Sequence, residues 1–137
     1  MNKHIVLADD HSMFRQGLVA LLEREGCKVD RVADGEQAVA AASAGAYDLI
    51  LMDLRMPGLS GVEAAKALRA KGVASPIAAL TADAFDEDKR ACLAAGMDDF
   101  LVKPLTQEAL RDALKRWTTG GASSGWTKTA TRSKVAG

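Results

Sequence analysis

Short strand-like runs alternate along this chain with longer segments of helical periodicity. The strand candidates are residues 4–9, 28–33, 48–53, 76–81 and 99–103. In the segments between them, apolar residues recur on one face of a helix, as Phe14, Leu18, Leu21 and Leu22 do at positions i, i+4, i+7 and i+8. The pattern predicts a fivefold alternation of strand and helix.

Capping signals mark the ends of the predicted helices independently of the apolar pattern. Asp34 with Gln37, and Ser60 with Glu63, match the capping box, in which two side chains satisfy free backbone N–H groups. At the other end, a glycine follows each candidate helix, where a left-handed residue closes the last turn without strain. These glycines are Gly26, Gly45, Gly72, Gly96 and Gly120.

The strand candidates differ in polarity, and the difference predicts their places in a sheet. Residues 4–9, 48–53 and 76–81 read as continuous apolar runs, which are typical of central strands covered by helices on both faces. Residues 28–33 alternate between apolar and charged side chains, which indicates an edge strand. We therefore predict an α/β fold with a parallel sheet between two layers of helices.

Side chains that can react or bind a ligand follow the apolar runs at the carboxyl ends of four strands. Asp9 and Asp10 end the first run, Asp53 the third, Thr81 the fourth and Lys103 the fifth. In an open α/β sheet the ligand lies outside these ends, near the point where strand order reverses. Each residue alone has a plainer interpretation: an acid can cap the next helix, a threonine can end a strand, and a lysine is usually solvated. Their conjunction at one edge favours a functional site.

This set of side chains is suited to phosphoryl transfer. Carboxylates gathered at one edge repel one another and need a cation, and all-oxygen ligands favour Mg²⁺, with Mn²⁺ as the alternative ion. Lys103 adds a compact positive charge, and Thr81 adds a hydroxyl donor for phosphoryl oxygens. Asp53 is a carboxylate that can attack a phosphoryl group without a base and form a mixed anhydride. His4 and His11 are interpreted as structural or solvated.

Composition indicates one core followed by a short tail. A chain of 137 residues with 48% apolar content suits one compact domain, which we assign to residues 1–118. Residues 119–137 are rich in Gly, Ser and Thr, and we predict a flexible tail in which Trp126 is incidental. The tail holds three of the 18 basic residues and none of the 18 acidic ones, which leaves a mildly acidic domain. We therefore expect no nucleic-acid partner.

Two further features of the sequence bear on the cellular compartment of the protein. Cys27 and Cys92 have no metal or redox spacing, so we expect them to be reduced and buried. No apolar run approaches the roughly 20 residues of a membrane span, and the first residues lack a signal-peptide core. We expect a cytoplasmic protein without membrane contact, or a cytoplasmic piece of something larger.

From about residue 3 to residue 117, the chain resembles the receiver domain of two-component response regulators. The matching motifs are the Asp9-Asp10 pair, Asp53 within Met52-Asp53-Leu54-Arg55-Met56-Pro57-Gly58, Thr81 within Ala79-Leu80-Thr81-Ala82, and Lys103-Pro104 after Phe100-Leu101-Val102. The resemblance implies a five-stranded parallel sheet of order 2-1-3-4-5 with five helices, in the doubly wound, flavodoxin-like arrangement.

The resemblance also implies a role for each residue at the sheet edge. Asp53 would accept a phosphoryl group from a histidine kinase, a histidine phosphotransfer protein, or both. Asp10, Asp53 and the backbone carbonyl of Arg55 would bind Mg²⁺, and Asp9 would hold the ion through water. Lys103 would bridge the acceptor and the phosphoryl group.

The resemblance also implies a conformational switch. Thr81 would move toward a phosphoryl oxygen, and Phe100 would swing inward with it, although Phe100 can also be interpreted as a plain core aromatic. The Lys103–Pro104 peptide is expected to be cis, a geometry that proline makes accessible.

The helix after the fourth strand is alanine-rich, and its main apolar groups are Phe85, Cys92 and Leu93. We expect weak anchoring, which suits a helix that shifts on signalling, and a dimer through the face of the fourth and fifth helices. Arg55 and Asp83 lie two residues after Asp53 and Thr81 and would tune the lifetime of the phosphoryl group. Sequence alone leaves open whether these two side chains pair.

Two other functional classes compete with this interpretation. A phosphohydrolase with an aspartyl nucleophile, like the haloacid dehalogenase-like enzymes, would carry a second acid two residues after the nucleophile, where this chain has Arg55. A binding module that works without phosphorylation is disfavoured because the whole acceptor set is present. As a receiver, the chain would catalyse at most its own phosphorylation and dephosphorylation, so we do not expect an enzyme in the wider sense.

Two segments point to different biological settings. Residues 91–104 resemble the receivers of hybrid sensor histidine kinases, whereas residues 7–18 resemble regulators with a DNA-binding output. We favour a receiver derived from a hybrid kinase, with a single-domain regulator as the alternative.

Overall fold

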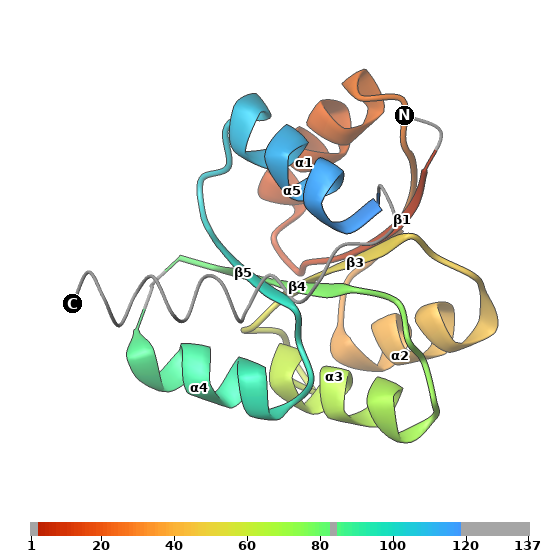
Figure 1. Cartoon of the computed structure of the whole chain (residues 1–137), viewed down its shortest axis with the longest axis vertical. Coiled ribbons are helices and arrows are strands. Elements are labelled where there is room, and N and C mark those ends of the chain that lie inside the picture. Colours follow the sequence, from red (N-terminus) through yellow and green to blue (C-terminus); the bar gives the residue numbers. More distant parts are fainter. Residues whose placement is uncertain (1–2, 83–84, 119–137) are drawn as a thin grey trace.

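A computed structural model describes residues 3–82 and 85–118 of the chain. Its elements, in order, are β1 (His4–Ala8), α1 (Ser12–Arg24), β2 (Lys28–Val32), α2 (Gly35–Ala44), β3 (Leu49–Asp53), α3 (Gly61–Ala70), β4 (Ile77–Thr81), α4 (Asp86–Ala94), β5 (Asp99–Val102) and α5 (Gln107–Thr118). The predicted alternation of strand and helix is confirmed (Figure 1).

The strands form one parallel sheet of order β2-β1-β3-β4-β5, as expected. The polar strand β2 occupies an edge, whereas every residue of β3 and β4 is buried. From β1 the chain turns outward to β2 and then returns to β3 on the other side. The carboxyl ends of β1 and β3 therefore flank the point at which strand order reverses, which is where ligands bind in this class of sheet.

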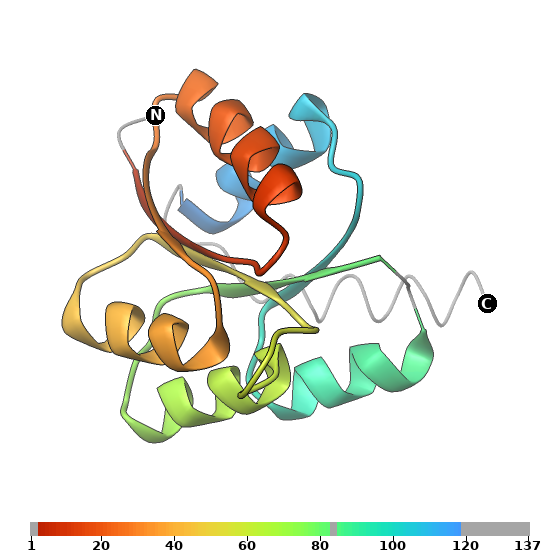
Figure 2. The ribbon, with the colours of Figure 1, turned by 180° about the vertical axis from the view of Figure 1, so that it is seen from behind.

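Helices cover both faces of the sheet. Helices α1 and α5 pack on one face, and α2, α3 and α4 pack on the other (Figures 1 and 2). Successive strand residues supply the two cores in turn: Ile5 and Leu7 of β1 join the α1–α5 cluster, and Val6 and Ala8 join the α2–α3–α4 cluster. Each large aliphatic side chain buried in this way contributes roughly 1.5 to 3 kcal/mol. The two cores together hold the strand ends in fixed positions.

The capping signals are confirmed at α3 and in part at α2. The Ser60 hydroxyl accepts a hydrogen bond from the Glu63 N–H at 3.2 Å, and Glu63 Oε1 accepts one from the Ser60 N–H at 3.0 Å. The Asp34 carboxylate accepts a hydrogen bond from the Gln37 N–H at 2.8 Å. The Gln37 side chain, however, accepts its hydrogen bond from the N–H of Ala33, one residue before the cap.

Three of the predicted glycine stops adopt the left-handed conformation. Gly26, Gly72 and Gly96 have φ values of 82°, 84° and 91°. The prediction is wrong at Gly45, whose φ is −124°, because the chain leaves α2 directly in an extended conformation. Gly120 lies outside the described residues.

Helix α4 has few apolar contacts, in agreement with the weak anchoring expected from the sequence. Phe85, at the N-cap, and Leu93 are 56% and 48% exposed, so neither anchors the helix. The small side chains of Cys92 and Ala95 form the contact with the core instead. Larger residues therefore point away from the sheet, and α4 rests on little apolar surface.

The remaining cysteine and histidine predictions agree with the structure. Cys27 and Cys92 are free and buried, and burial raises the pKa of the Cys92 thiol to about 12. His4 has a structural contact, since its Nε2 atom lies 2.8 Å from Oδ2 of Asp30. Asp83, Trp126 and the predicted tail lie outside the described residues. Within residues 3–82 and 85–118, no helix has the length and apolar character required to cross a bilayer.

Candidate functional site

Asp53 is the last residue of the buried strand β3, and its side chain is almost inaccessible. Residue Asp53 is 4% exposed, and its Oδ1 atom accepts a hydrogen bond from the Arg55 N–H at 3.1 Å. Gly61, at the start of α3, lies directly against this strand end. A Cβ atom at Gly61 would be 2.3 Å from the Asp53 carbonyl oxygen, so the close approach requires glycine.

Lys103 reaches Asp53 from the far side of β4. Its Nζ atom lies 2.9 Å from Oδ2 of Asp53 and 3.1 Å from Oδ2 of Asp9. The Lys103 side chain is 15% exposed, and its backbone N–H donates to the Thr81 carbonyl at 2.7 Å. The Lys103–Pro104 peptide is cis, as expected. The Lys103 ammonium, which follows β5, thus contacts the carboxylates at the ends of β1 and β3.

Asp9 belongs to this cluster and does not cap α1. It is fully buried, and its Oδ1 atom accepts a hydrogen bond from the His11 N–H at 2.7 Å. His11 itself is the N-cap of α1 and makes no side-chain capping bond, so neither Asp9 nor Asp10 is the cap residue. The Arg15 guanidinium donates to the Asp9 carbonyl and ties α1 to the strand end. The two acids are therefore free for another role.

The acid pair divides into a buried and an exposed carboxylate. Asp10 is exposed, and among the described residues one ligand atom each from Asp9, Asp10 and His11 lie within 4.8 Å of one another. Asp53 is not part of that group, and the Lys103 ammonium pairs with both its carboxylate and that of Asp9.

The electrostatics of the cluster favour an added cation. Burial raises the pKa of Asp53 above its usual range, and the bonds from Lys103 and from the Arg55 N–H offset this effect only in part. Burial also acts to lower the pKa of Lys103, but its ion pairs with Asp53 and Asp9 outweigh burial and raise it. Within this cluster, one ammonium compensates two buried carboxylates and the exposed Asp10 adds a third.

The donor set fits a hard divalent cation. The Oδ2 atom of Asp9 is buried and makes no hydrogen bond, although it is in ion-pair range of Lys103. Together with Asp10 and Asp53 it offers carboxylate oxygens of the kind that Mg²⁺ takes in proteins.

The remaining predicted site residues differ in their exposure. Thr81 ends β4 and is buried, and Phe100 on β5 is buried in the core beneath α4. The Arg55 side chain projects into solvent and lies 3.6 Å from Oδ2 of Asp88 on α4. Its predicted neighbour Asp83 lies outside the described residues.

Two contacts in the site were not predicted from the sequence. The Phe14 ring of α1 lies beneath the Lys103 ammonium, with Nζ 4.4 Å from the ring centroid. Sequence periodicity assigned Phe14 to the apolar face of α1, and nothing in that pattern distinguishes it from Leu18. The contact of Gly61 with Asp53 was not predicted either, because residues 60–63 were interpreted only as a capping box.

Comparisons with known proteins agree with this architecture. Residues 5–115 match the sequence model of the response regulator receiver domain family. The chain is 39% identical over 119 residues to the sensor protein GacS of Pseudomonas syringae pv. syringae; the match covers 83% of this chain and 13% of GacS. The chain therefore spans only a small part of that relative.

Two solved structures are also similar to this chain. ShkA, determined full-length in complex with AMPPNP, is 74% identical with a TM-score of 0.79, over 86% of this chain and 24% of ShkA. The receiver domain of the sensor histidine kinase PA1611 from Pseudomonas aeruginosa PAO1, which has a magnesium ion in its active site cleft, is 42% identical with a TM-score of 0.80, over 86% of this chain and 98% of that one. This chain belongs to the response regulator receiver domain family of two-component phosphorelay proteins.

Proposed function

We propose that Asp53 accepts a phosphoryl group from a phosphohistidine donor and that this modification switches the surface around Thr81 and Phe100. The observation that carries the proposal is the position of Lys103, whose ammonium lies 2.9 Å from Asp53, with both side chains largely buried. A buried nucleophile beside a fixed positive charge is the arrangement that stabilises a transferring phosphoryl group.

The chain's own residues account for the bond changes. An Oδ atom of Asp53 forms a bond to phosphorus while the bond from phosphorus to the donor imidazole nitrogen breaks, and the imidazole leaves with the electron pair. The Asp53 carboxylate needs no general base in its ionised form. Lys103 then neutralises a phosphoryl oxygen, and the Thr81 hydroxyl donates a hydrogen bond to another.

Mg²⁺ is the proposed cofactor. Asp10, Asp53 and the backbone carbonyl of Arg55 would hold it, with Asp9 contributing through water. When bound, the ion would neutralise charge on the phosphoryl oxygens and reduce the repulsion between the carboxylates. The Asp9 Oδ2 atom, which has an ion pair but no hydrogen bond, and the excess of carboxylates over ammonium groups support this assignment.

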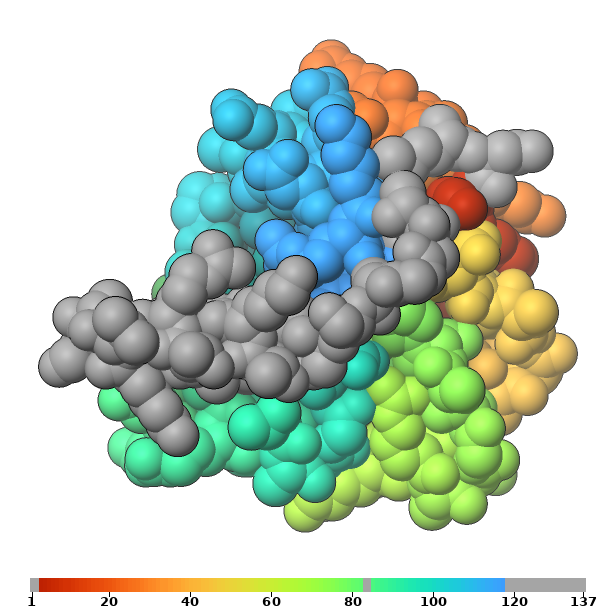
Figure 3. Space-filling view, in the orientation of Figure 1, coloured from red at the N-terminus to blue at the C-terminus, as the bar shows by residue number. Residues whose placement is uncertain are grey.

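The proposed switch uses the weak attachment of α4. Thr81 would shift toward the modified Asp53, and Phe100 would follow, which changes the surface that α4 covers. Figure 3 shows parts of α4 and α5 on the same face of the molecule, and we propose this face for partner or dimer contacts. Arg55 and Asp83 would govern access of water to the phosphoryl group and so its lifetime.

The proposed partners are a histidine kinase, a histidine phosphotransfer protein, or both, in the cytoplasm. The likeness to GacS supports a hybrid-kinase setting for a receiver at residues 1–118 with a tail at 119–137. A single-domain regulator is the alternative setting, and phosphotransfer assays with candidate donors distinguish the two.

Beryllofluoride, a phosphoryl analogue, tests the switch. Adding it with Mg²⁺ to the ¹⁵N-labelled chain is expected to shift the amide resonances of Thr81 and Phe100. The Asp53→Asn variant, which lacks the acceptor carboxylate, should show no such shift. If the wild-type spectrum does not change either, the switch proposal fails.

A phosphohydrolase is the alternative function. It is disfavoured because Arg55 occupies the position where such enzymes carry an acid, and in this structure Arg55 faces Asp88 on α4. Incubation with a generic phosphate ester separates the two functions. A receiver takes up at most one phosphoryl group on Asp53, whereas repeated turnover of the ester would support the hydrolase.

A further inference from the structure

The Lys103 ammonium has a third neighbour besides the two carboxylates. Its Nζ atom lies 4.4 Å from the centroid of the Phe14 ring, within the range of a cation–π interaction. Phe14 belongs to the beginning of α1, whereas Lys103 follows β5. The ring therefore joins the helix after the acid pair to the cation of the site.

We propose that Phe14 is a positioning residue for phosphorylation: the face of its ring holds the Lys103 ammonium against Asp53. The role rests on the proposed function of Asp53 as the phosphoryl acceptor. Phe14 itself touches neither the acceptor nor the donor and acts through Lys103.

An aromatic ring can immobilise the ammonium in a way that a further polar group would not. A lysine side chain is long and flexible, so its charge must be immobilised to stabilise a transition state. The negative face of an aromatic ring attracts the ammonium without adding another hydrogen-bond acceptor. The Lys103 ammonium keeps its ion pairs with Asp53 and Asp9 and can still donate to an incoming phosphoryl oxygen.

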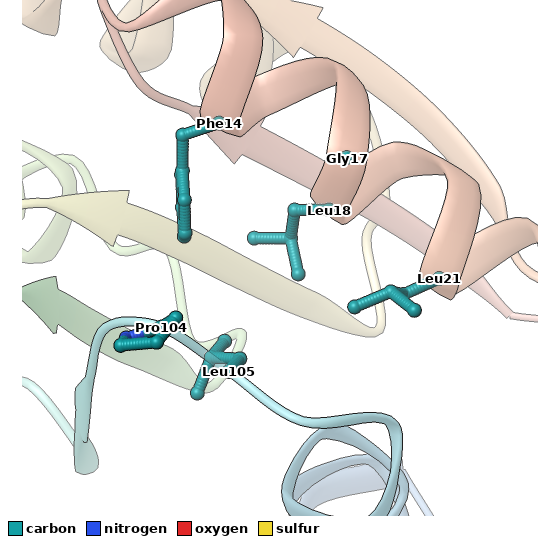
Figure 4. A pocket seen from close by; sticks show the side chains of 6 residues that line it. All are labelled: Phe14, Gly17, Leu18, Leu21, Pro104 and Leu105. Carbon is teal, nitrogen blue, oxygen red and sulfur yellow. The ribbon is translucent and has the colours of Figure 1, made fainter.

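The ring is partly buried and packs against the α1–α5 core cluster. Phe14 lines a cavity of about 280 Å³ between α1 and the loop after β5, together with Gly17, Leu18, Leu21, Pro104 and Leu105. Figure 4 shows the ring projecting from α1 toward Pro104, which follows Lys103 in the sequence. The loop that carries Lys103 therefore forms the wall of the cavity opposite Phe14.

Fluorinated phenylalanines at position 14 test the proposal with little change in shape. Each added fluorine weakens the negative face of the ring. We expect the initial rate of Asp53 phosphorylation by a small phosphodonor such as phosphoramidate, with Mg²⁺, to fall step by step along the series. Phe14→Leu should lower this rate by about two- to tenfold, and Phe14→Trp should retain it.

A second readout does not depend on phosphorylation. The ε-methylene protons of Lys103 should show an upfield ring-current shift and restricted motion by ¹³C relaxation, and both should be lost in Phe14→Leu. Leu21→Ala is the matched control, because it alters the same cavity wall about two helical turns away from Phe14. It should leave the Lys103 signals unchanged.

The outcomes separate this proposal from the proposed function. Equal phosphorylation rates across the fluorinated series, or equal Lys103 mobility in wild type and Phe14→Leu, would overturn the positioning role. If the wild-type chain takes up no phosphate, the proposed function fails, and the Lys103 relaxation data alone decide whether Phe14 positions the ammonium.

Discussion

The Lys103 ammonium lies 2.9 Å from the Asp53 carboxylate, although the two residues are separated by 50 positions in sequence. Their strands are not neighbours, because β4 pairs with both β3 and β5. The contact spans the carboxyl edge of three strands and defines the centre of the site.

Replacing Lys103 tests its proposed role in phosphoryl transfer. Lys103→Met keeps most of the side-chain length and removes the charge. The rate of Asp53 phosphorylation by a small phosphodonor should therefore fall about 100-fold, which is the usual effect of removing a preorganised electrostatic group from an active site. Lys66→Met is the control, since Lys66 is an exposed lysine on α3 and its loss should not affect the rate. A Lys103→Met variant that is phosphorylated at the wild-type rate would exclude this role.

The raised pKa of Asp53 predicts a pH-dependent stability difference. Because the folded state binds this proton more tightly than the unfolded state, ionised Asp53 costs stability as the pH rises from its ordinary value near 3.9 through the raised pKa. Without Mg²⁺, Asp53→Asn should therefore be more stable than wild type at pH 7, and the gap should shrink toward pH 4. Urea titrations across this range measure it. A gap that does not vary with pH would rule out buried charge as its cause.

Mg²⁺ should stabilise the folded protein. At a concentration of 100 times the dissociation constant, the gain in unfolding free energy is about 2.7 kcal/mol. The gain should decrease as the pH falls through the raised pKa of Asp53, because protons compete with the ion. Thermal unfolding with and without Mg²⁺ measures the effect, which Asp10→Asn should abolish and Asp112→Asn, at an exposed acid of α5, should not. Equal gains in both variants would contradict the proposed ligand set.

The contact of Gly61 with Asp53 predicts opposite effects for two glycine substitutions. Gly61→Ala places a Cβ atom 2.3 Å from the Asp53 carbonyl oxygen and should cost about 1 to 3 kcal/mol of stability. Gly17→Ala meets no atom within 4 Å inside α1 and should add about 1 kcal/mol. Chemical denaturation of both variants checks the pair. Similar small effects would mean that α3 does not press on the strand end.

The sequence was most informative where local chemistry determines structure. Continuous apolar runs identified β1, β3 and β4 as central strands, and the Ser60 box fixed the start of α3, because both signals depend only on nearby residues. Gly45 was misjudged because its backbone conformation depends on where β3 begins. The weak anchoring expected of α4 agrees with the exposure of Phe85 and Leu93, since α4 presents small residues to the sheet.

The site was predictable in its members but not in its contacts. Polar residues at strand ends identified Asp9, Asp53, Thr81 and Lys103, since parallel strands bring their carboxyl ends to one edge. That Lys103 would lie between two carboxylates, or that Phe14 would lie beneath it, depends on the packing of α1 and the loop after β5. Such contacts leave no periodic signal in the sequence.

Intact-mass spectrometry after incubation with Mg²⁺ and phosphoramidate tests the central claim most directly. Wild type should gain the mass of one phosphoryl group, and Asp53→Asn should gain none. The same gain in Asp53→Asn, or no gain in a wild-type chain that is folded and binds Mg²⁺, would contradict the account.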